Sequence, residues 1–409
     1  MKIYTETAGL ALILMLCLVF SSACSFGENA AAPTPSSAIT LPQTTASLTN
    51  ANADVRLLFV NVGKADALII CANDRNYLVD AGEKSSVPKL LGAMRLLGID
   101  AFDGVFLTHT HSDHIGGMEA LASHCGISML YRANYSQPSK KGVNKFDELS
   151  AELALPQTIL QAGDALHLTE NVDIRVLGPL VYNEEDDNDN SLVLMLVANG
   201  RKILLTGDMQ FAEEETLLSS GCELHAEVLK VGNHGNPDAT SNAFADAVAP
   251  SLAVISTDTS VDTDSANKRV LEALSGAEIH ITQDYRYGLM LAVSADGSMK
   301  LYAPETPQSS SSSLSIIGID KKAQTITIRN EGEKTDISGF MILSEKGGEL
   351  FVFPEGTQID PGQSLSVAAY GGVGDYIWDE EEKPWNSKKA DAGILFDQFG
   401  NELFRLDSK

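Results

Sequence analysis

The chain has 409 residues and carries 55 Asp and Glu against 29 Lys and Arg, which gives a formal net charge of −26. With 44% hydrophobic and 21% charged residues, it has the composition of a globular protein rather than of a disordered, collagen-like or multi-span membrane protein. This acidic balance argues against a surface that holds nucleic acid by neutralising phosphates, so any DNA chemistry would need metal ions to supply positive charge.

The first 24 residues have the pattern of a secretion signal. An unbroken apolar run from Ala8 to Phe20 is too short to span a membrane comfortably and leads into small residues that a signal peptidase accepts. Cys24 directly after Ala23 resembles a bacterial lipoprotein cleavage site, although Ser21 stands where that pattern prefers Leu. We therefore expect a lipoprotein signal at 1–24 and a lipid anchor on Cys24, at the extracellular face of a bacterial cell membrane. The alternatives are secretion after ordinary cleavage and an uncleaved anchor.

Two segments that are poor in large apolar residues divide the rest of the chain. Residues 25–54 are rich in Ala, Pro, Ser and Thr and are expected to form a disordered tether. Residues 303–313 combine prolines with a run of serines and are expected to form a flexible linker. This linker separates residues 55–302, with 34 acidic and 18 basic residues, from 314–409, with 17 and 10. Neither region is therefore a basic nucleic-acid module.

Residues 55–302 alternate short apolar runs with segments of helical periodicity, which is the pattern of an α/β fold. Apolar residues recur at helical spacing from Val87 to Leu97 and stop at Gly98. Further helices are expected near 211–219, 241–248 and 267–274. Strands are expected at 55–62, 67–71, 76–79, 104–107, 173–177, 192–197, 203–205, 228–231, 253–256, 278–281 and 288–293.

The segment after the linker has the pattern of a β-sandwich, with strands at 314–319, 325–329, 339–343, 350–353 and 364–369 separated by turn residues. Its motifs resemble the lamin-tail domain: Asp336–Leu343, Phe351–Thr357, Pro361–Leu365, and the stretch from Trp378 to Asp391. The resemblance implies an immunoglobulin-like module without catalytic motifs. It would act as a stabilising or spacing unit, or attach the protein to a surface polymer or another protein. Acidic residues 379–382 disfavour direct DNA binding by this module.

The chemistry of the larger region is concentrated in His109, His111, Asp113 and His114, which follow a predicted strand. The chain has eight histidines, and three of them fall within the six positions 109–114. A strand end followed by a turn aims alternate side chains at one point, so His109 and His111 suit one metal ion while Asp113 and His114 face a second. A polar loop with incidental histidines is disfavoured because clustered imidazoles repel each other when protonated.

Four further motifs surround these histidines in order: Phe59–Ala67, Leu78–Gly82, Leu204–Asp208 and Val228–Gly235. Together with His-x-His-x-Asp-His they resemble the metallo-β-lactamase superfamily, in particular its ComEC-type branch, over essentially all of residues 55–302. The resemblance implies an αββα sandwich with a metal-binding edge. The expected fold class is therefore an α/β metallo-β-lactamase sandwich followed by an all-β, immunoglobulin-like sandwich.

The same resemblance implies two divalent metal ions, zinc or manganese. The first would be bound by His109 and His111, the second by Asp113, His114 and His234, and Asp208 would bridge them. Asp113, Asp208 and His234 would also take part in catalysis, and Asp80 would orient the site. Simpler interpretations exist for three of these residues: Asp208 as a helix N-cap, Asp80 as a turn or cap residue, and His234 as a loop residue.

The chain departs from the ComEC-type pattern at several positions. Asn61 and Ala65 replace the Asp and the second Gly of Asp-Val-Gly-Gln-Gly-Asp, and Asn233 replaces the first His of His-His-Gly. Losing an outer partner of this kind typically costs about 10–100-fold in affinity or activity. True lactamases place a further His between the Asp-His pair and the bridging Asp, whereas this stretch offers Asn188–Ser191, with Asn190, as in the ComEC-type branch. The first metal would therefore keep an open position, which weakens the β-lactamase interpretation.

These features predict a surface-tethered hydrolase that uses a metal-activated water on phosphodiesters, as a phosphodiesterase or nuclease does. Its substrate would be nucleic acid or another phosphodiester. The alternative is a surface binding protein of the same fold in which Asn61, Ala65 and Asn233 have impaired turnover. The four remaining histidines are expected to be surface or packing residues: His124, His167, His225 and His280.

Overall fold

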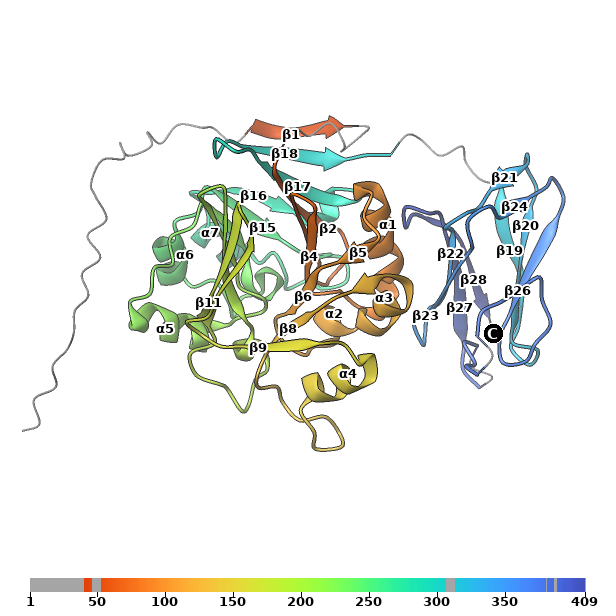
Figure 1. Ribbon diagram of the computed structural model, residues 1–409, viewed down its shortest axis with the longest axis horizontal. Coiled ribbons are helices and arrows are strands. Elements are labelled where there is room, and N and C mark those ends of the chain that lie inside the picture. Colours follow the sequence, from red (N-terminus) through yellow and green to blue (C-terminus); the bar gives the residue numbers. More distant parts are fainter. Residues whose placement is uncertain (1–39, 46–52, 307–312, 380, 386–387, 409) are drawn as a thin grey trace, which may run out of the picture. The chain divides into compact units, whose positions relative to one another are not determined.

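The computed structural model describes residues 40–45, 53–306, 313–379, 381–385 and 388–408, with only the backbone path for 40–45 (Figure 1). The predicted signal segment and Cys24 lie outside these residues, as do most positions of the predicted tether and linker. Within the described part of the chain, no helix combines the length and apolar character needed to cross a membrane.

The first half of the larger domain is built on a nine-stranded sheet. Its spatial order is β1 (Thr40–Thr45), β18 (Met299–Pro304), β17 (Gly288–Val293), β2 (Val55–Val60), β3 (Leu68–Ala72), β4 (Arg75–Val79), β6 (Gly104–Leu107), β8 (Leu130–Ala133) and β9 (Gln157–Leu160). The central strands β2 and β3 are almost completely buried. From β4 onward the strands run parallel, so their carboxyl ends meet at one edge.

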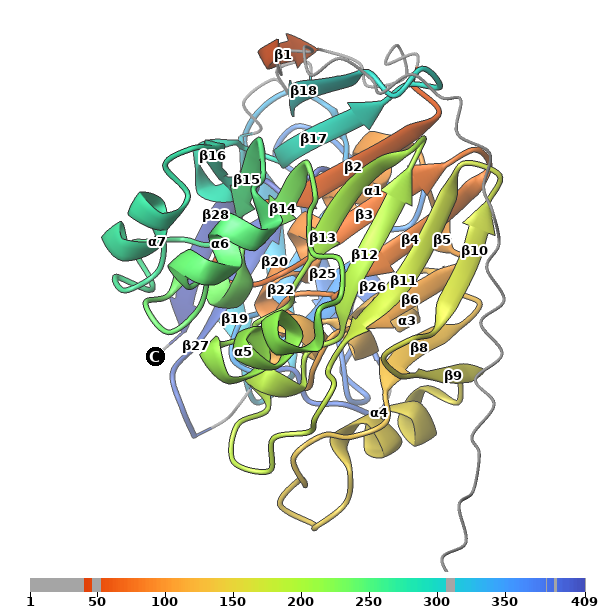
Figure 2. The ribbon, with the colours of Figure 1, turned by 90° about the vertical axis from the view of Figure 1, so that its left-hand side faces the viewer.

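A seven-stranded sheet forms the second half. Its order is β10 (Ala165–Thr169), β11 (Val172–Gly178), β12 (Val193–Ala198), β13 (Arg201–Leu205), β14 (Val228–Lys230), β15 (Leu252–Ile255) and β16 (Glu278–Ile281). The pairs β13–β14, β14–β15 and β15–β16 are parallel. One apolar cluster contains buried side chains of both sheets, so the sheets face each other across a shared core (Figure 2).

Helices cover the outer faces of this sandwich. The helices following strands of the first sheet are α1 (Val87–Leu97), α2 (Ser112–Ile115), α3 (Met118–His124) and α4 (Lys145–Leu153), and those following strands of the second are α5 (Phe211–Ser220), α6 (Asn242–Val248) and α7 (Lys268–Ala273). A second apolar cluster packs Leu217, Phe244 and Val270 from α5, α6 and α7 against the second sheet. The layer order is therefore helix, sheet, sheet, helix. Single-turn 3₁₀ helices occur at Lys84–Ser86, Asn188–Asn190, Gly232–Gly235 and Thr282–Asp284, and a two-stranded ladder joins β5 (Ala101–Phe102) to β7 (Gly126–Ile127).

The C-terminal domain consists of two four-stranded sheets around one core. The sheets are β19 (Leu314–Asp320), β20 (Thr325–Asn330), β25 (Ser364–Ala368), β26 (Tyr376–Ile377), and β23 (Glu349–Val352), β22 (Met341–Ser344), β27 (Asp391–Phe396), β28 (Glu402–Ser408); β21 (Thr335–Asp336) pairs with β24 (Gln358–Ile359). Both sheets contribute to a core that includes Ile328, Phe351 and the fully buried Trp385. The domain is thus β-rich, and its immunoglobulin-like and lamin-tail character stays a prediction.

Three features differ from the sequence-based expectations. The predicted tether contains β1, which pairs in parallel with the edge strand β18 and so finds backbone hydrogen bonds that its composition did not indicate. The predicted linker begins later than expected, because Ala303 and Pro304 belong to β18. A small apolar cluster also joins Val87 of α1 to side chains of β22, β23 and β27, including Met341 and Phe396, so the two domains share packed surface.

Candidate metal centre

The predicted site residues gather where neighbouring strands end. Asp80 directly follows β4, and the histidine motif follows β6, which pairs in parallel with β4. Asp208 and His234 follow β13 and β14, a parallel pair of the second sheet. The N–H of Leu192 donates to the carbonyl of Thr108 (2.9 Å) and links the two sheets at this edge. Residues separated by more than 150 positions in sequence are therefore brought to one point.

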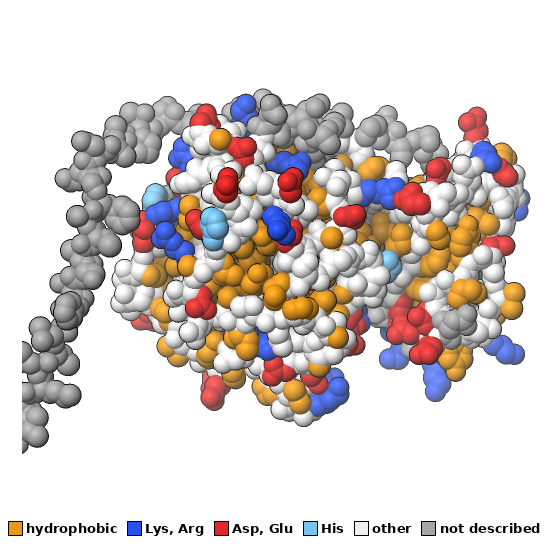
Figure 3. Space-filling view, viewed as in Figure 1, with side chains coloured by type: hydrophobic (Ala, Val, Ile, Leu, Met, Phe, Trp, Pro, Cys, Tyr) orange, Lys and Arg blue, Asp and Glu red, His pale blue; other side chains and the backbone are white. Residues whose placement is uncertain are grey.

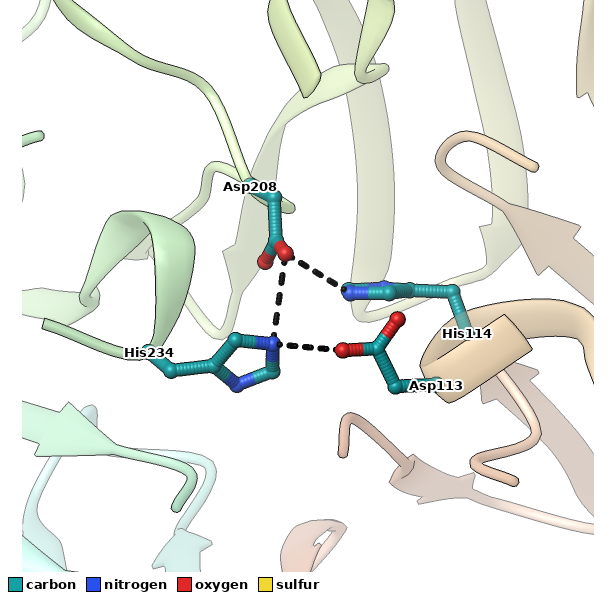
Figure 4. Close-up of side chains that lie close together, drawn as sticks. All are labelled: Asp113, His114, Asp208 and His234. Atoms are coloured by element: carbon teal, nitrogen blue, oxygen red, sulfur yellow. Dashed lines mark ion pairs between the residues drawn. The ribbon is translucent and has the colours of Figure 1, made fainter. Parts of the chain in front are cut away.

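Four of the predicted ligands form a compact buried group: Asp113, His114, Asp208 and His234 (Figure 4). Oδ2 of Asp208 lies 3.2 Å from Nε2 of His114 and 3.2 Å from Nε2 of His234. Nε2 of His234 also lies 3.3 Å from Oδ2 of Asp113. The two imidazoles are fully buried, and both carboxylates are less than one tenth exposed. This is the set expected to hold the second metal ion together with its bridging carboxylate.

The hydrogen-bond pattern of this group fits a metal ion. Nε2 of His109, His114 and His234 and Oδ1 of Asp208 are buried and form no hydrogen bond. Leaving buried polar atoms without partners is costly, and native proteins satisfy nearly all of them. Three imidazole nitrogens and a carboxylate oxygen directed at one place are also the donors that zinc and similar ions prefer. The residues present therefore suit a divalent cation.

The other two histidines of the motif lie beside this group. The ring centroids of His109 and His114 are 4.1 Å apart, and those of His109 and His111 are 4.7 Å apart. Nε2 of His109 lies 4.0 Å from Oδ2 of Asp208. His109 is fully buried, whereas His111 is partly exposed. The structure thus places His111 beside His109 and His109 beside Asp208, and the binding of a first metal ion by these residues stays a prediction.

Each buried imidazole is oriented through its second nitrogen. Nδ1 of His114 donates to Oδ2 of Asp80 (2.7 Å), and Nδ1 of His234 donates to the carbonyl of Ser256 (2.8 Å). Nδ1 of His109 lies 3.3 Å from Oγ of Ser191, which also accepts from the N–H of Asp208 (3.0 Å). Such outer contacts hold the Nε2 atoms toward a metal. The position of Asp80 is therefore that of the orienting residue predicted from the motif.

Asp187 is an outer contact that the sequence analysis missed. Its fully buried carboxylate accepts from the N–H of Thr110 (3.2 Å) and from the Thr110 hydroxyl, between His109 and His111. Its other oxygen accepts from the N–H of Gln137 (3.0 Å). Asp187 therefore holds the histidine loop in place. The local sequence carried no signal for this role, because the partners lie 50 and 77 positions away.

Two lysines and a further aspartate also lie at the centre without having been predicted. Lys230 is buried, pairs with Asp66 and donates to the carbonyl of Gly207 (3.1 Å). Its Nζ is 4.0 Å from Oδ1 of Asp208. Oδ1 of the buried Asp66 forms no hydrogen bond and lies 3.8 Å from Nδ1 of His234. A charged Lys inside the apolar strand β14 was the available sequence signal, since buried lysines need a partner.

Lys64 stands at the more exposed side of the centre. Its Nζ donates to Oδ2 of Asp113 over 2.6 Å, and its side chain is 27% exposed against 6% for Lys230. Burial alone lowers the pKa of Lys64, but the hydrogen bond and the charge of Asp113 outweigh this, so its pKa lies above the ordinary value. Lys64 is therefore a stable positive charge that solvent and small anions can reach.

The carboxylates and imidazoles tune each other in the metal-free protein. Burial favours the neutral form of Asp208, but the charges of His114 and His234 outweigh it and hold the pKa of Asp208 well below its ordinary value. Asp113 behaves likewise: burial alone raises its pKa, and the close imidazole of His234 and the charge of His114 lower it. For His234, burial lowers the pKa, yet Asp208 and Asp113 raise it to about 9. In the metal-free protein, protons thus occupy ring nitrogens from which a binding metal ion would displace them.

Two predicted supporting residues lie in the surrounding loops and point elsewhere. Asn190 binds the backbone of Asn183 through both amide atoms, so it shapes the 183–190 loop rather than reaching the ligands. Asn233 donates to Oδ1 of Asp238 (2.9 Å) and adopts a left-handed backbone, with φ 42°. The amide of Asn233 therefore braces the loop that presents His234. The remaining histidines, expected to be surface or packing residues, bind local partners: His124, His167, His225 and His280.

The fold and the centre define a class of protein. Residues 60–259 match the family model described as the metallo-beta-lactamase superfamily, and this stretch contains every residue of the candidate centre. This part of the chain is a metallo-β-lactamase superfamily domain, as its motifs predicted.

This part of the chain is also similar to several curated proteins. It is 28% identical over 223 residues to ComE operon protein 3 of Bacillus subtilis (strain 168), covering 52% of this chain and 28% of that protein. It is also 28% identical over 200 residues to competence protein ComA of Neisseria gonorrhoeae, covering 48% and 26%. A shorter match, 46% identical over 56 residues, links it to the anti-Pycsar protein Apyc1 of Bacillus phage 010DV004, covering 14% and 21%. The chain spans about a quarter of the length of the first two relatives.

Two solved structures that are similar to this chain are distant from it in sequence. The metallo-beta-lactamase fold protein YhfI of Bacillus subtilis is 16% identical, with a TM-score of 0.40, and the match covers 58% of this chain and 98% of that one. A diphosphatase of the PhnP family is 13% identical, with a TM-score of 0.37, covering 58% and 96%.

Proposed function

We propose that this protein is a metal-dependent hydrolase that cleaves phosphodiester bonds, as a phosphodiesterase or nuclease tethered at the cell surface. The observation that carries the proposal is the convergence of three buried imidazole nitrogens without hydrogen bonds on Oδ2 of Asp208, at 3.2 Å for His114 and His234 and 4.0 Å for His109. A purely structural role does not explain why the protein buries polar atoms without hydrogen bonds, which costs free energy of folding.

Two divalent ions, zinc or manganese, suit the available ligands. His109, His111 and Asp208 would hold one ion, and Asp113, His114, His234 and Asp208 the other. Ions held there supply Lewis acidity, which lowers the pKa of water and offsets negative charge developing on a phosphate. Asp80, Ser256 and Ser191 keep the imidazoles in their ligating orientation.

One positive charge at the centre suits an anionic substrate, although the chain as a whole is acidic. The chain carries a net charge of −26, which repels phosphates at long range. On the face shown in Figure 3, basic side chains are scattered among acidic ones rather than gathered into a broad patch. Lys64 places a positive charge directly beside the ligand Asp113. Substrate capture would therefore depend on the centre itself and on Lys64.

Two observations favour a second function, a surface binding protein with impaired turnover. Lys64 stands where the related branch usually has Gln, and its ammonium occupies Oδ2 of Asp113, an oxygen that a metal would need. Asn233 donates to Asp238 and supplies no proton to the centre. In this alternative the same fold binds a phosphodiester without cleaving it.

Turnover tests separate the two functions. The full chain, incubated with zinc or manganese, is assayed on bis-p-nitrophenyl phosphate, single-stranded DNA, RNA, phosphocholine esters and a β-lactam. The proposal predicts metal-dependent hydrolysis of at least one phosphodiester, its loss in Asp208→Asn, and no β-lactam turnover. A protein that binds metal but cleaves no phosphodiester would support the binding alternative and reject the enzyme.

A further inference from the structure

A cavity of about 670 Å³ lies in the C-terminal β-sandwich, away from the metal centre. Its walls come from the β19–β20 turn, the β22–β23 turn, Tyr370 and the segment leading into β27. The charged residues that line it are five lysines and two acids: Lys321, Lys322, Lys346, Lys383, Lys389, Glu349 and Asp391. This cavity is not part of the site proposed above.

The concentration of lysine here contrasts with the rest of the chain. Acidic residues outnumber basic ones 17 to 10 in residues 314–409, yet five of the eight lysines in that region line one cavity. Two acids of the tract that disfavoured DNA binding, Asp379 and Glu382, line a neighbouring cavity with Trp378 that shares Gly347 and Glu349 with this one. The positive charge is therefore local and survives the overall acidity.

The two acids of the cavity leave a formal charge of +3 among its lining side chains, since five lysines face them. Asp391 is 6% exposed, and its carboxylate accepts from the N–H of Lys346 (3.0 Å) and the hydroxyl of Ser344 (3.2 Å). Burial raises the pKa of Glu349, which favours its neutral form. Nζ of Lys346 itself donates to the carbonyl of Ala390 (3.4 Å), so this contact leaves its charge unneutralised.

Aromatic side chains complete the cavity. Tyr370 is half exposed, and Nζ of Lys383 lies 3.7 Å from the centroid of its ring. Trp385 is 1% exposed and lines the cavity, and its indole Nε1–H has no acceptor among the described residues. Gln324 fixes the backbone of Trp385, because its side chain accepts from the backbone N–H of Trp385 (3.0 Å) and donates to the backbone carbonyl (2.8 Å). The fixed indole thus lies in a wall of the lysine-lined cavity, where the Nζ of Lys321 donates to the carbonyl of Lys389 (2.9 Å) and keeps its charge.

We propose that this cavity binds an anion with several closely spaced phosphate groups. Clustered ammonium groups bind phosphates as point charges and can each take a separate oxygen. The volume lies in the range of ordinary ligand sites, about 300–1,000 Å³. The phosphates come either from a small polyphosphate or from a nucleic-acid backbone, and the C-terminal domain is then a binding module that works independently of metal chemistry.

Intrinsic fluorescence of the full chain tests this directly. The chain has two tryptophans, Trp378 and Trp385, whose ring centroids are 5.7 Å apart, so both report on this region. Titration with inorganic tripolyphosphate is expected to change the emission saturably. Lys346→Glu and Lys383→Glu should each weaken the apparent affinity at least about tenfold. The matched control is Lys334→Glu, which alters a lysine of the same domain that pairs with Asp360 outside the cavity.

Further arms identify the source of the phosphates and separate this site from the metal centre. If a single-stranded oligonucleotide displaces tripolyphosphate, the source is a nucleic-acid backbone, and the slope of log K against log salt should fall by about 0.7 for each lysine removed. If only tripolyphosphate binds, the source is a small polyphosphate. Asp208→Asn should bind like wild type. The proposal is overturned if emission does not respond, or if the cavity variants, folded by thermal unfolding, bind as tightly as Lys334→Glu.

Discussion

Oδ2 of Asp80 lies 2.7 Å from Nδ1 of His114, while Nε2 of the same ring lies 3.2 Å from Oδ2 of Asp208. Asp80 also accepts from the N–H and the hydroxyl of Thr108, so its carboxylate is fixed from two sides. The fully buried imidazole is therefore held between an orienting acid and a ligating acid. This arrangement removes the freedom of His114 to turn away from a metal.

Replacing Asp80 tests that orienting role. Asp80→Asn keeps the size of the side chain but removes the charge that holds Nδ1–H of His114, so we expect metal affinity to fall about 10–100-fold. Competition with a chromogenic chelator measures the affinity. Asp103→Asn is the control, since Asp103 binds Arg75 and the N–H of Asn76 at the surface. Equal affinities of the two variants would contradict the assigned role.

Metal affinity should rise with pH. The pKa of His234 in the metal-free protein is about 9, because Asp208 and Asp113 outweigh the effect of burial. Below that pH a bound metal must displace a proton from the His234 ring, so this residue alone should increase the affinity up to about tenfold per pH unit until pH 9, and His114, whose pKa is also raised, adds to the dependence. Isothermal titration in buffers of different ionisation enthalpy counts the protons released. Metal binding without proton release at pH 7 would contradict this account.

Glu213 should make folding stability depend on pH. Burial raises its pKa to about 7, against the partly compensating N–H of Leu180. At pH values between the pKa of Glu213 in the unfolded chain and its pKa in the folded protein, the folded state binds more protons. The contribution of Glu213 to folding stability is therefore present at low pH and is lost as pH rises through 7.

The matching variant is Glu213→Gln, which keeps an acceptor for Leu180 and cannot ionise. Its Tm should equal that of wild type at pH 5 and exceed it by about 2–4 °C at pH 8, the shift for roughly 1 kcal/mol in a domain of this size. Calorimetry at both values, with the exposed Glu215→Gln as control, decides the matter. A Tm difference that does not change with pH would exclude ionisation of Glu213 as the cause.

Lys64 distinguishes substrate capture from inhibition of the centre. If Lys64 attracts the phosphodiester, Lys64→Gln should raise KM about tenfold with little change in kcat, and salt should affect the variant less. If its bond to Asp113 impairs turnover, the same variant should raise kcat instead. Steady-state kinetics on bis-p-nitrophenyl phosphate gives both constants. Lys300→Gln, at an exposed position of β18, is the control.

Much of the fold follows from local sequence patterns. Helix α1 begins and ends where predicted because Pro88 suits a first turn and Gly98 adopts the left-handed conformation that ends it. Buried central strands such as β17 were also predicted at their observed bounds. Strands β27 and β28 were not predicted, and neither were the edge strands β1 and β9. The pairing of an edge strand depends on a partner distant in sequence, which local periodicity does not encode.

The candidate site also contains residues that the local sequence predicts and residues that it does not. The His109–His114 motif is continuous in sequence, and Asp208 and His234 each follow a buried strand, so motif order placed them. Asp66 and Lys230 were missed because their roles arise from contact across 164 positions, between the β2–β3 turn and β14. Sequence spacing predicts ligands that follow strand ends, whereas charge pairs inside the site are decided by how the two sheets face each other.

The metal content of the purified full chain tests the central claim most directly. After incubation with zinc or manganese and removal of loosely bound ions, elemental analysis should find up to two divalent ions per wild-type chain. His109→Ala and Asp208→Ala should lose bound metal, because both remove atoms from the converging set, while His124→Ala should keep the wild-type content, since its ring binds the carbonyl of Ala120. A wild-type chain that retains no divalent ion, or an Asp208→Ala variant that retains the full content, would contradict the account.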